Sequence, residues 1–253
     1  MKRISALYFF CILTAFAFAQ RPAADEIKTS KGSLTIQPVL HAAMVLTWDK
    51  KTIYVDPYDN EKAFAGLAAP DYILITDIHP DHLDLKTLNK LETAKAKLIV
   101  PVAVAEKLPD ELKTKSLVLT NGQSFTENGI TFTAVAMYNL PEATDAMHVK
   151  GRGNGYILNM GGKNIYISGD TEDITEMRLL KNIDVAFVCM NLPYTMDIHQ
   201  ASSAVLEFKP SIVYPYHYRG KDGMSDTEAF KKLVNAGNKD IDVRLRNWYP
   251  EYK

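Results

Sequence analysis

The segment ITDIHPDHLD, residues 75–84, places two histidines and three aspartates within ten positions. It begins at the end of the apolar run DYILIT, which predicts a buried strand, and it precedes a predicted helix over Leu85–Thr93. Imidazole and carboxylate groups are ligands for zinc, iron and manganese, and a strand-to-helix loop allows such side chains to converge. The candidate metal ligands in this loop are Asp77, His79, Asp81 and His82. The plainer alternative is a solvated polar loop in which Asp84 caps the helix.

Three more potential ligands lie beside strand-like runs elsewhere in the chain. IYISGD ends at Asp170, where Gly169 leaves room for close backbone approach, and IVYPYH ends at His217. His148 lies shortly before the run GYIL. Each residue alone is more often a hydrogen-bonded structural group. Together with the loop at 75–84 they supply enough ligands for a metal centre.

Short strands and four helices must position these residues. The predicted strands are SLTIQPVL, AMVLTWD, KTIYVDP, DYILIT, AKLIVPV, SLVLTNG and GITFTAVAMYN in the first half, and NGYILNM, KNIYISGDT, DVAFVCMNLP, SIVYPYHY and DVRLRNWYP in the second. The predicted helices are Leu85–Thr93, Asp173–Leu180, His199–Phe208 and Ser225–Ala236. Ser225 is the expected N-cap of the last helix, with Glu228 completing a capping box and Gly237 ending it. This order fits two mixed sheets packed face to face with helices outside.

The order and spacing of the candidate ligands resemble the metallo-β-lactamase-fold hydrolases, whose pattern is T-H-x-H-x-D-H after a strand, a later His, an Asp in a G-D-T segment, and a final His. Here these positions read TDIHPDH at 76–82, His148, SGDT at 168–171 and His217. The runs LHAAMVLTWDKKTIYVDPY, NLPYTMDIHQAS and FKPSIVYPYHYRG resemble the ascorbate-phosphate lactonase-like branch. The resemblance implies an α/β fold, an αββα four-layer sandwich of two mixed β-sheets, with two metals at the sheet edges.

The resemblance also implies an assignment of ligands. The first metal would take Asp77, His79 and His148. The second metal would take Asp81, His82 and His217, and Asp170 would bridge the two. The expected cofactors are two divalent metal ions, zinc foremost, with manganese or iron as alternatives. A hydroxide held between them would be the nucleophile.

Asp77 departs from the family pattern, which has histidine at this position. Two divalent cations carry four positive charges, which Asp77, Asp81, Asp170 and one hydroxide would balance. Histidine at position 77 would leave one positive charge. The departure therefore predicts a weaker Lewis acid, and a first site that is more open to iron or manganese or only partly occupied. The interpretation that we favour is that Asp77 substitutes as a plain oxygen ligand with little further effect, because a carboxylate at this position still ligates a metal.

Four residues have candidate roles beside or within the metal centre. His41, in the early hairpin, and Asp56, before Pro57, are candidates to orient ligands from outside the centre; a satisfied core histidine and a turn residue are the alternatives. Asp81 and His199 are the candidate catalytic residues, with His199 placed to donate a proton to a leaving group. The alternative for His199 is the first turn of a helix without any chemical role.

Residues 1–19 have the pattern of a cleaved signal peptide. Lys2 and Arg3 precede an apolar run that ends in the small-x-small sequence AFA at 17–19. An apolar run of about 16 residues is short for a membrane-spanning helix, so we expect no integral membrane segment after cleavage. The expected protein is exported, either to the periplasm or to the medium, as one domain over residues 20–253.

Composition narrows the classes of partner. The chain is 47% hydrophobic and 23% charged, which suits one globular domain with a sizeable core. Acidic residues slightly outnumber basic ones and no basic patch occurs, so nucleic acid is not expected as a docking partner. After removal of the leader, Cys189 is the single cysteine, which excludes an internal disulfide, and its apolar neighbours predict burial.

These observations predict an exported dinuclear metal-dependent hydrolase that cleaves a lactone or phosphoester bond in a small molecule. A phosphodiesterase acting on a lipid-derived substrate is the alternative enzyme, and β-lactam hydrolysis is less favoured. A non-catalytic metal-binding relative is the alternative from another class of function. Fold alone does not choose among these activities.

Overall fold

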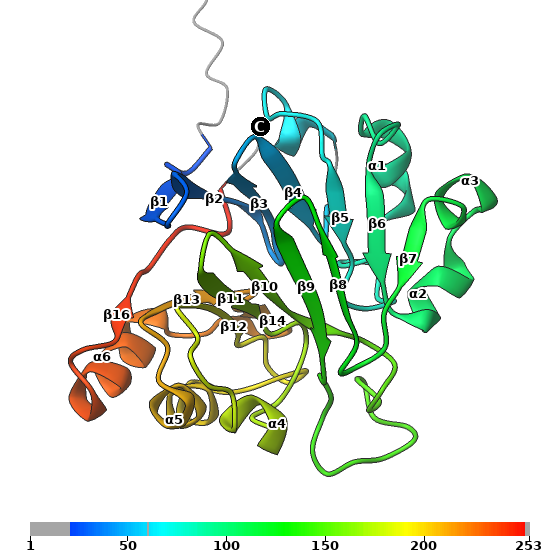
Figure 1. The fold of residues 1–253 in the computed structure, drawn as a ribbon. Coiled ribbons are helices and arrows are strands. Elements are labelled where there is room, and N and C mark those ends of the chain that lie inside the picture. Colours follow the sequence, from blue (N-terminus) through cyan, green and yellow to red (C-terminus); the bar gives the residue numbers. More distant parts are fainter. Residues whose placement is uncertain (1–20, 60, 251–253) are drawn as a thin grey trace, which may run out of the picture.

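The computed structural model describes residues 21–59 and 61–250. The predicted signal peptide, residues 1–19, lies outside the described residues. The described part of the predicted domain forms two β-sheets that lie between outer helices (Figure 1).

Each sheet holds seven strands and mixes antiparallel with parallel pairs. The first runs in chain order through β1 (Asp25–Lys28), β2 (Ser33–Leu40), β3 (Ala43–Trp48), β4 (Lys51–Val55), β5 (Tyr72–Leu74), β6 (Lys97–Val100) and β7 (Ser116–Val118). The second has the order β16 (Asp242–Val243), β13 (Ile212–Tyr216), β12 (Val185–Cys189), β11 (Lys163–Ile167), β10 (Gly155–Met160), β9 (Ile130–Val135) and β8 (Ser124–Glu127). A short separate ribbon pairs β14 (Arg219–Gly220) with β15 (Gly223–Met224).

Helices cover the outer faces of both sheets (Figure 1). The first sheet carries η1 (Glu61–Phe64), α1 (Leu85–Lys90), α2 (Val102–Lys107) and α3 (Asp110–Lys113), and the second carries α4 (Thr175–Arg178), α5 (Ile198–Phe208) and α6 (Thr227–Gly237). One apolar cluster lies between the first sheet and its helices, and a larger one fills the space between the sheets and under α5 and α6. The predicted sandwich of two mixed sheets with outer helices is confirmed.

Local details differ from the sequence prediction, most clearly at the helices. The last helix begins after Asp226, whose carboxylate accepts from the backbone N–H of Ala229, so the predicted N-cap at Ser225 is wrong. The Ser225 hydroxyl instead donates to the carbonyl of Met190, so it is not available to cap. The sequence prediction also missed α2 and α3, which are each six residues or shorter. Such short helices carry too little periodicity to be recognised.

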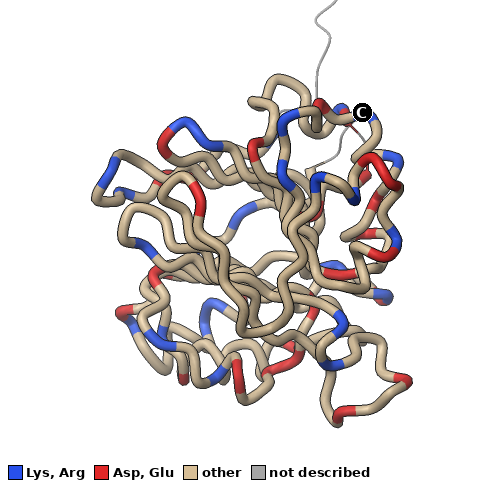
Figure 2. Tube along the Cα trace, turned by 45° about the vertical axis from the view of Figure 1, so that its right-hand side comes forward, with Lys and Arg blue, Asp and Glu red and all other residues tan. Residues whose placement is uncertain are grey.

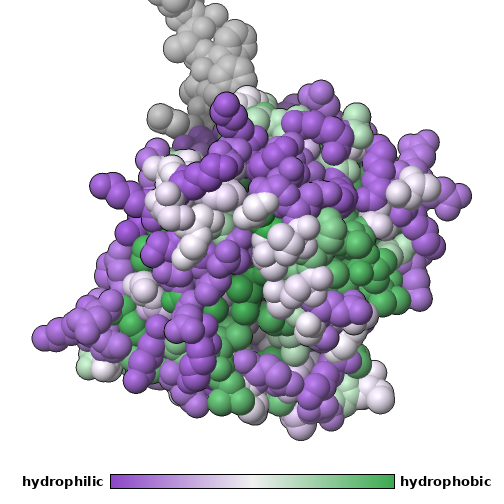
Figure 3. Space-filling view, viewed as in Figure 1, coloured by the Kyte–Doolittle hydropathy of each residue, from purple (hydrophilic) through white to green (hydrophobic). Residues whose placement is uncertain are grey.

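The surface mixes both signs of charge. In the view of Figure 2, basic and acidic residues both occur along the loops and outer helices. In Figure 3, hydrophilic side chains cover much of the outer helices, while apolar side chains are visible across the middle of the face. Within the described ranges, no helix has the length and apolar character needed to cross a membrane.

Candidate metal centre

The candidate ligands follow the carboxyl ends of parallel strands in both sheets. β4 and β5 are parallel neighbours, as are β11, β12 and β13. Asp56 follows β4, the loop at 76–82 follows β5, Asp170 follows β11 and His217 follows β13. Parallel strands bring their carboxyl ends to one edge of a sheet, which is where ligands bind in such sheets. The face-to-face packing of the sheets then brings the two edges together.

Three side chains form the most buried part of this cluster. His82 and His217 are fully buried, and Asp170 is 3% exposed. The Nε2 atom of His82 lies 3.3 Å from Oδ2 of Asp170, and Nε2 of His217 lies 3.2 Å from Oδ1. The two Nε2 atoms lie 3.3 Å from each other. Two ligands about 2.1 Å from a tetrahedral metal are separated by about 3.4 Å, so these spacings suit a cation.

The hydrogen bonding of the same residues also fits a cation. The Nδ1 atom of His82 donates to the Asp56 carboxylate 2.9 Å away, which turns Nε2 toward the cluster. There Nε2 faces Nε2 of His217. Among the described residues, Oδ1 of Asp170 accepts no hydrogen bond, although it is buried. A buried carboxylate oxygen and converging imidazole nitrogens are the donor set expected of a zinc-type site.

A second group lies on the other side of Asp170. Asp77, His79 and His148 offer ligand atoms that lie within 4.8 Å of one another. Nε2 of His148 is 3.2 Å from Oδ2 of Asp170, which places this carboxylate between the two groups. Nδ1 of His79 lies 2.6 Å from Oδ2 of Asp77, and Asp77 is fully buried. These three residues form a second group of potential ligands, and Asp170 lies beside both groups.

Polar partners outside the two groups fix the orientation of the ligands. Asp56 accepts from the backbone N–H and hydroxyl of Thr76 at 2.8 and 2.7 Å, besides its contact with His82. The Asn139 side-chain oxygen accepts from the backbone N–H of His148 at 2.8 Å and lies 3.1 Å from its Nδ1. His148 therefore also presents Nε2 to the cluster. These are the carboxylate–histidine and amide–histidine contacts that orient metal ligands.

His41 joins Asp81 to the end of the chain. Its Nε2 atom lies 3.1 Å from Oδ2 of Asp81, and its Nδ1 lies 2.9 Å from the hydroxyl of Tyr249. Asp81 is in turn 3.5 Å from Nε2 of His217. His41, Asp81 and His217 thus form a third group whose potential ligand atoms lie within 4.8 Å. The position of His41 supports an orienting role toward Asp81.

The charges of the cluster shift the pKa values of its members. Burial alone would raise the pKa of Asp170, but the charges of His217 and His82 hold it well below its usual range. Burial opposes protonation of His82, yet the carboxylates of Asp170 and Asp56 raise its pKa well above the ordinary value. Burial lowers the pKa of His41 to about 4, so this imidazole is neutral at physiological pH. Such opposed shifts within one cluster are typical of functional sites.

The backbone at the centre is strained. Three non-glycine residues of the cluster have positive φ, namely His41 at 61°, Asp56 at 41° and His217 at 46°. Residues in this region cost about 1–3 kcal/mol each and concentrate at binding and catalytic sites. Gly169 also has positive φ, and a Cβ there would lie 2.6 Å from Sδ of Met137 and 3.2 Å from the backbone carbonyl of Asn154, so the backbone approaches closely at this position as predicted.

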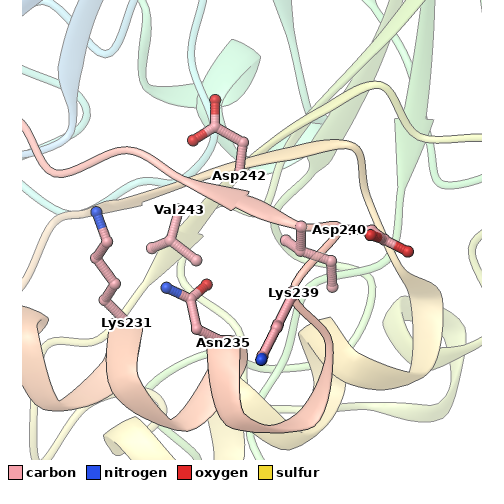
Figure 4. A pocket seen from close by; sticks show the side chains of 7 residues that line it. Lys231, Asn235, Lys239, Asp240, Asp242 and Val243 are labelled. Atoms are coloured by element: carbon pink, nitrogen blue, oxygen red, sulfur yellow. The ribbon is translucent and has the colours of Figure 1, made fainter.

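A cavity of about 300 Å³ opens onto the cluster. Its lining residues are His79, Pro80, Asp81, Met147, His148, Asp170, Asn191 and Tyr194. His199 is not among them: it is exposed in the first turn of α5, where its backbone N–H is capped by Asp197. Another cavity, between α6 and β16, is lined by side chains that include Lys231, Lys239 and Asp242 (Figure 4). It contains none of the candidate metal ligands.

Sequence reasoning missed three residues that contact the candidate ligands. Arg152 pairs with Asp77, Asn139 orients His148, and Tyr249 contacts His41. Arg152 lies in the glycine-rich segment GRGNG at 151–155, where no pattern marks it as a contact of the loop at 76–82. No spacing rule could have found Tyr249, which is 208 positions from its partner.

Comparisons with known proteins agree with this geometry. Residues 35–217 match the β-lactamase superfamily domain. A UPF0173 metal-dependent hydrolase of Pyrococcus abyssi is 31% identical over 205 residues, covering 77% of this chain and 89% of the relative. A crystal structure assigned as a metal-dependent hydrolase of Parabacteroides distasonis has a TM-score of 0.79 and 38% identity, covering 89% of this chain and 98% of that one. Igni18, a metallo hydrolase of Ignicoccus hospitalis, shares the fold with a TM-score of 0.73 and 23% identity, covering 86% and 96% of the two chains.

Proposed function

Because this chain belongs to the metallo-β-lactamase-fold family of metal-dependent hydrolases, we propose that it is an exported dinuclear enzyme that cleaves a lactone or phosphoester bond in a small molecule. One observation carries the proposal: imidazole Nε2 atoms from three histidines converge on the buried carboxylate of Asp170. Burying these polar groups is costly unless they are paired or coordinate a metal, and a bound cation would satisfy all four.

The proposed ligands divide between two metal positions. Asp77, His79 and His148 hold the first, His82, His217 and Asp81 hold the second, and Asp170 belongs to both. Zinc is the proposed metal, with manganese or iron as alternatives. When bound, such metals polarise the electrophilic oxygen and lower the pKa of water toward neutrality.

The residues of the cavity supply binding and orientation. The Asn191 amide lies beside Asp170 and His217, with its Nδ2 atom 3.5 Å from the carboxylate. Asn191 and Tyr194 line the same cavity as Asp81, so both offer polar groups to a bound substrate. Asp81, whose side chain is 30% exposed, remains our proposed catalytic residue on the open side of the centre. His199 is exposed and does not line this cavity, so its proposed role in proton donation rests on the sequence pattern alone.

The experiment combines metal analysis with a hydrolysis panel. Protein expressed from the full-length sequence is purified, stripped of metal, and supplied with zinc, manganese or iron. The panel holds a lactone, a phosphodiester and a β-lactam. We expect about two metals per chain and metal-dependent hydrolysis of the lactone or the phosphodiester. Metal binding without turnover of any class would contradict the proposed activity, and metal-independent turnover would contradict the mechanism.

A lipid-derived phosphodiester is the second candidate substrate. Met147 lines the cavity although it is 47% exposed, so it offers an apolar surface at the cavity mouth. An acyl chain would cover such a surface. A matched pair of phosphodiesters, one with and one without an acyl chain, tests this: Met147→Ser should lower kcat/KM only for the acylated substrate.

Export is proposed from the pattern of residues 1–19 alone. Cell fractionation of the producing organism, together with determination of the mature N-terminus, is the direct test. A mature chain that begins at Gln20 outside the cytoplasm is the expected result. An intact N-terminus in the cytoplasmic fraction would refute it.

A further inference from the structure

Arg152 forms an ion pair with the one ligand that departs from the family pattern. Its Nε atom donates to Oδ1 of Asp77 at 3.3 Å, and its Nη2 donates to Oδ2 at 3.1 Å. The Arg152 side chain is 21% exposed and the Asp77 side chain is fully buried, so the pair is shielded from solvent on the side of Asp77. Two parallel contacts of this kind are the strong form of an arginine–carboxylate interaction.

The fold holds Arg152 in this place from several directions. Nη2 also donates to the carbonyl of Met147 at 2.6 Å. Two residues later, the backbone N–H of Asn154 donates to the carbonyl of Thr76, directly before Asp77. Gly153 lies between them, and a Cβ there would approach the same Thr76 carbonyl to 2.9 Å. The chain at 152–154 is therefore tightly packed against the start of the ligand loop.

This pairing changes what Asp77 can offer to a metal. A carboxylate has about four acceptor positions. Two are committed to the guanidinium, and Nδ1 of His79 lies 2.6 Å from Oδ2. The arginine also places a fixed positive charge beside the first metal position, and like charges repel. By contrast, Asp170 carries an oxygen with no hydrogen bond from the described residues.

We propose that Arg152 is a positioning residue that makes the two metal positions unequal, so that the His82–Asp170–His217 position binds metal tightly and the Asp77–His79–His148 position binds it weakly. The proposal rests on the function proposed above, because it assumes that both groups hold metal. It also accounts for the charge of the centre: Arg152 returns the positive charge that aspartate removes at position 77.

The test is a zinc titration of the metal-stripped protein in competition with a chromophoric chelator, with absorption spectra of Co²⁺ as a second reading of each position. We expect two binding steps that differ by at least about tenfold, which is within the range of outer contacts on metal ligands. Two steps of equal affinity in the unaltered protein would overturn the proposal without any variant.

Variants identify the residue responsible. Arg152→Gln should tighten the weaker step by about tenfold and leave the tighter step unchanged. Arg152→Lys keeps the charge but loses the two-pronged contact. The zinc affinity of its weaker step should therefore fall between that of the unaltered protein and that of Arg152→Gln. Arg178→Gln is the matched control, because Arg178 is 23% exposed and pairs with Asp173 and Glu207 away from the centre. If zinc affinity at the Asp77–His79–His148 position falls in both Arg152 variants, Arg152 supports metal binding by Asp77; if it is unchanged, Arg152 has no effect on it. Either result overturns the proposal.

The outcome is separable from that of the proposed function. Unequal metal steps without hydrolysis would support this inference and refute the enzyme assignment. Hydrolysis together with two zinc-binding steps of equal affinity would support the enzyme assignment and refute this inference. Absence of any metal binding would refute both.

Discussion

Asp56 is the residue whose substitution most directly tests how the ligands are oriented. Its carboxylate is fully buried and contacts Nδ1 of His82 at 2.9 Å, besides two donors of Thr76. In Asp56→Asn an amide NH₂ can replace Oδ2, which offers a donor to Nδ1 where an acceptor is needed. The imidazole proton then moves to Nε2, the atom that faces Asp170. The substitution therefore places a proton on the His82 nitrogen that would bind the metal, although none of the candidate ligands is replaced.

The expected magnitude follows from these contacts. Loss of an outer carboxylate partner lowers metal affinity by about 10–100-fold, which is about 1.4–2.8 kcal/mol. A hydrogen bond to a charged group contributes about 1.5–3 kcal/mol. Asp56→Asn weakens, without fully removing, the two that Oδ2 accepts from the Thr76 hydroxyl and His82 Nδ1. The free energy of unfolding, measured in urea, should therefore fall by about 2–4 kcal/mol. Zinc titration and urea unfolding measure the two effects separately.

The control for this prediction is Asp71→Asn. Asp71 accepts from the backbone N–H of Thr52 at 2.9 Å and pairs with Lys51 and Lys95, but it contacts none of the candidate ligands. It should lower stability without changing metal affinity. If Asp56→Asn also leaves zinc affinity unchanged while stability falls, the tautomer argument is refuted and Asp56 is a purely structural residue.

Three further predictions concern the frame around the centre. Gly169→Ala should lower the free energy of unfolding by about 1–2 kcal/mol from its φ alone and by more through crowding, whereas Gly122→Ala, with positive φ and open space, should show only the first effect in the same urea experiment. Burial alone would raise the pKa of Asp25, but the hydrogen bond from Tyr214 and two arginine charges lower it below its ordinary value of 3.8. The ionised carboxylate therefore stabilises the folded protein fully above pH 3.8, and this stabilisation is lost as pH falls through the lower pKa of the folded state. Asp25→Asn should therefore be less stable at pH 7 and should flatten the acid side of the pH–stability curve; an unchanged curve would contradict the pairing. Burial raises the pKa of Cys189 to about 11, so its thiol should react with an aromatic disulfide reagent only as the protein unfolds, and rapid labelling of native protein would show access that the fold does not provide.

Much of the fold follows from local sequence. Apolar runs of strand length predicted most of the two sheets, and Asp49 and Lys50 form the tight turn of the β3–β4 hairpin. Strand propensity and turn chemistry act over a few residues, so they can be read from sequence. Helix boundaries were less determined: α6 starts at Thr227 because Asp226 caps it, while the Ser225 hydroxyl is held by a carbonyl 35 positions away.

For the candidate site, too, some features follow from the sequence and others only from the tertiary structure. Its ligand types and their places at strand ends are properties of the sequence, and parallel strands necessarily bring such ends to one edge. The contacts that tune the ligands are not: Asp77 meets Arg152 across 75 positions, and His41 meets Tyr249 across 208. His199 illustrates the converse, since its residue type suggested chemistry but the helix directs it to solvent. Sequence determined which groups reach the edge, because strand and turn preferences are local. Only the packing of the two sheets decided which of them touch, because side-chain direction and burial depend on distant parts of the chain.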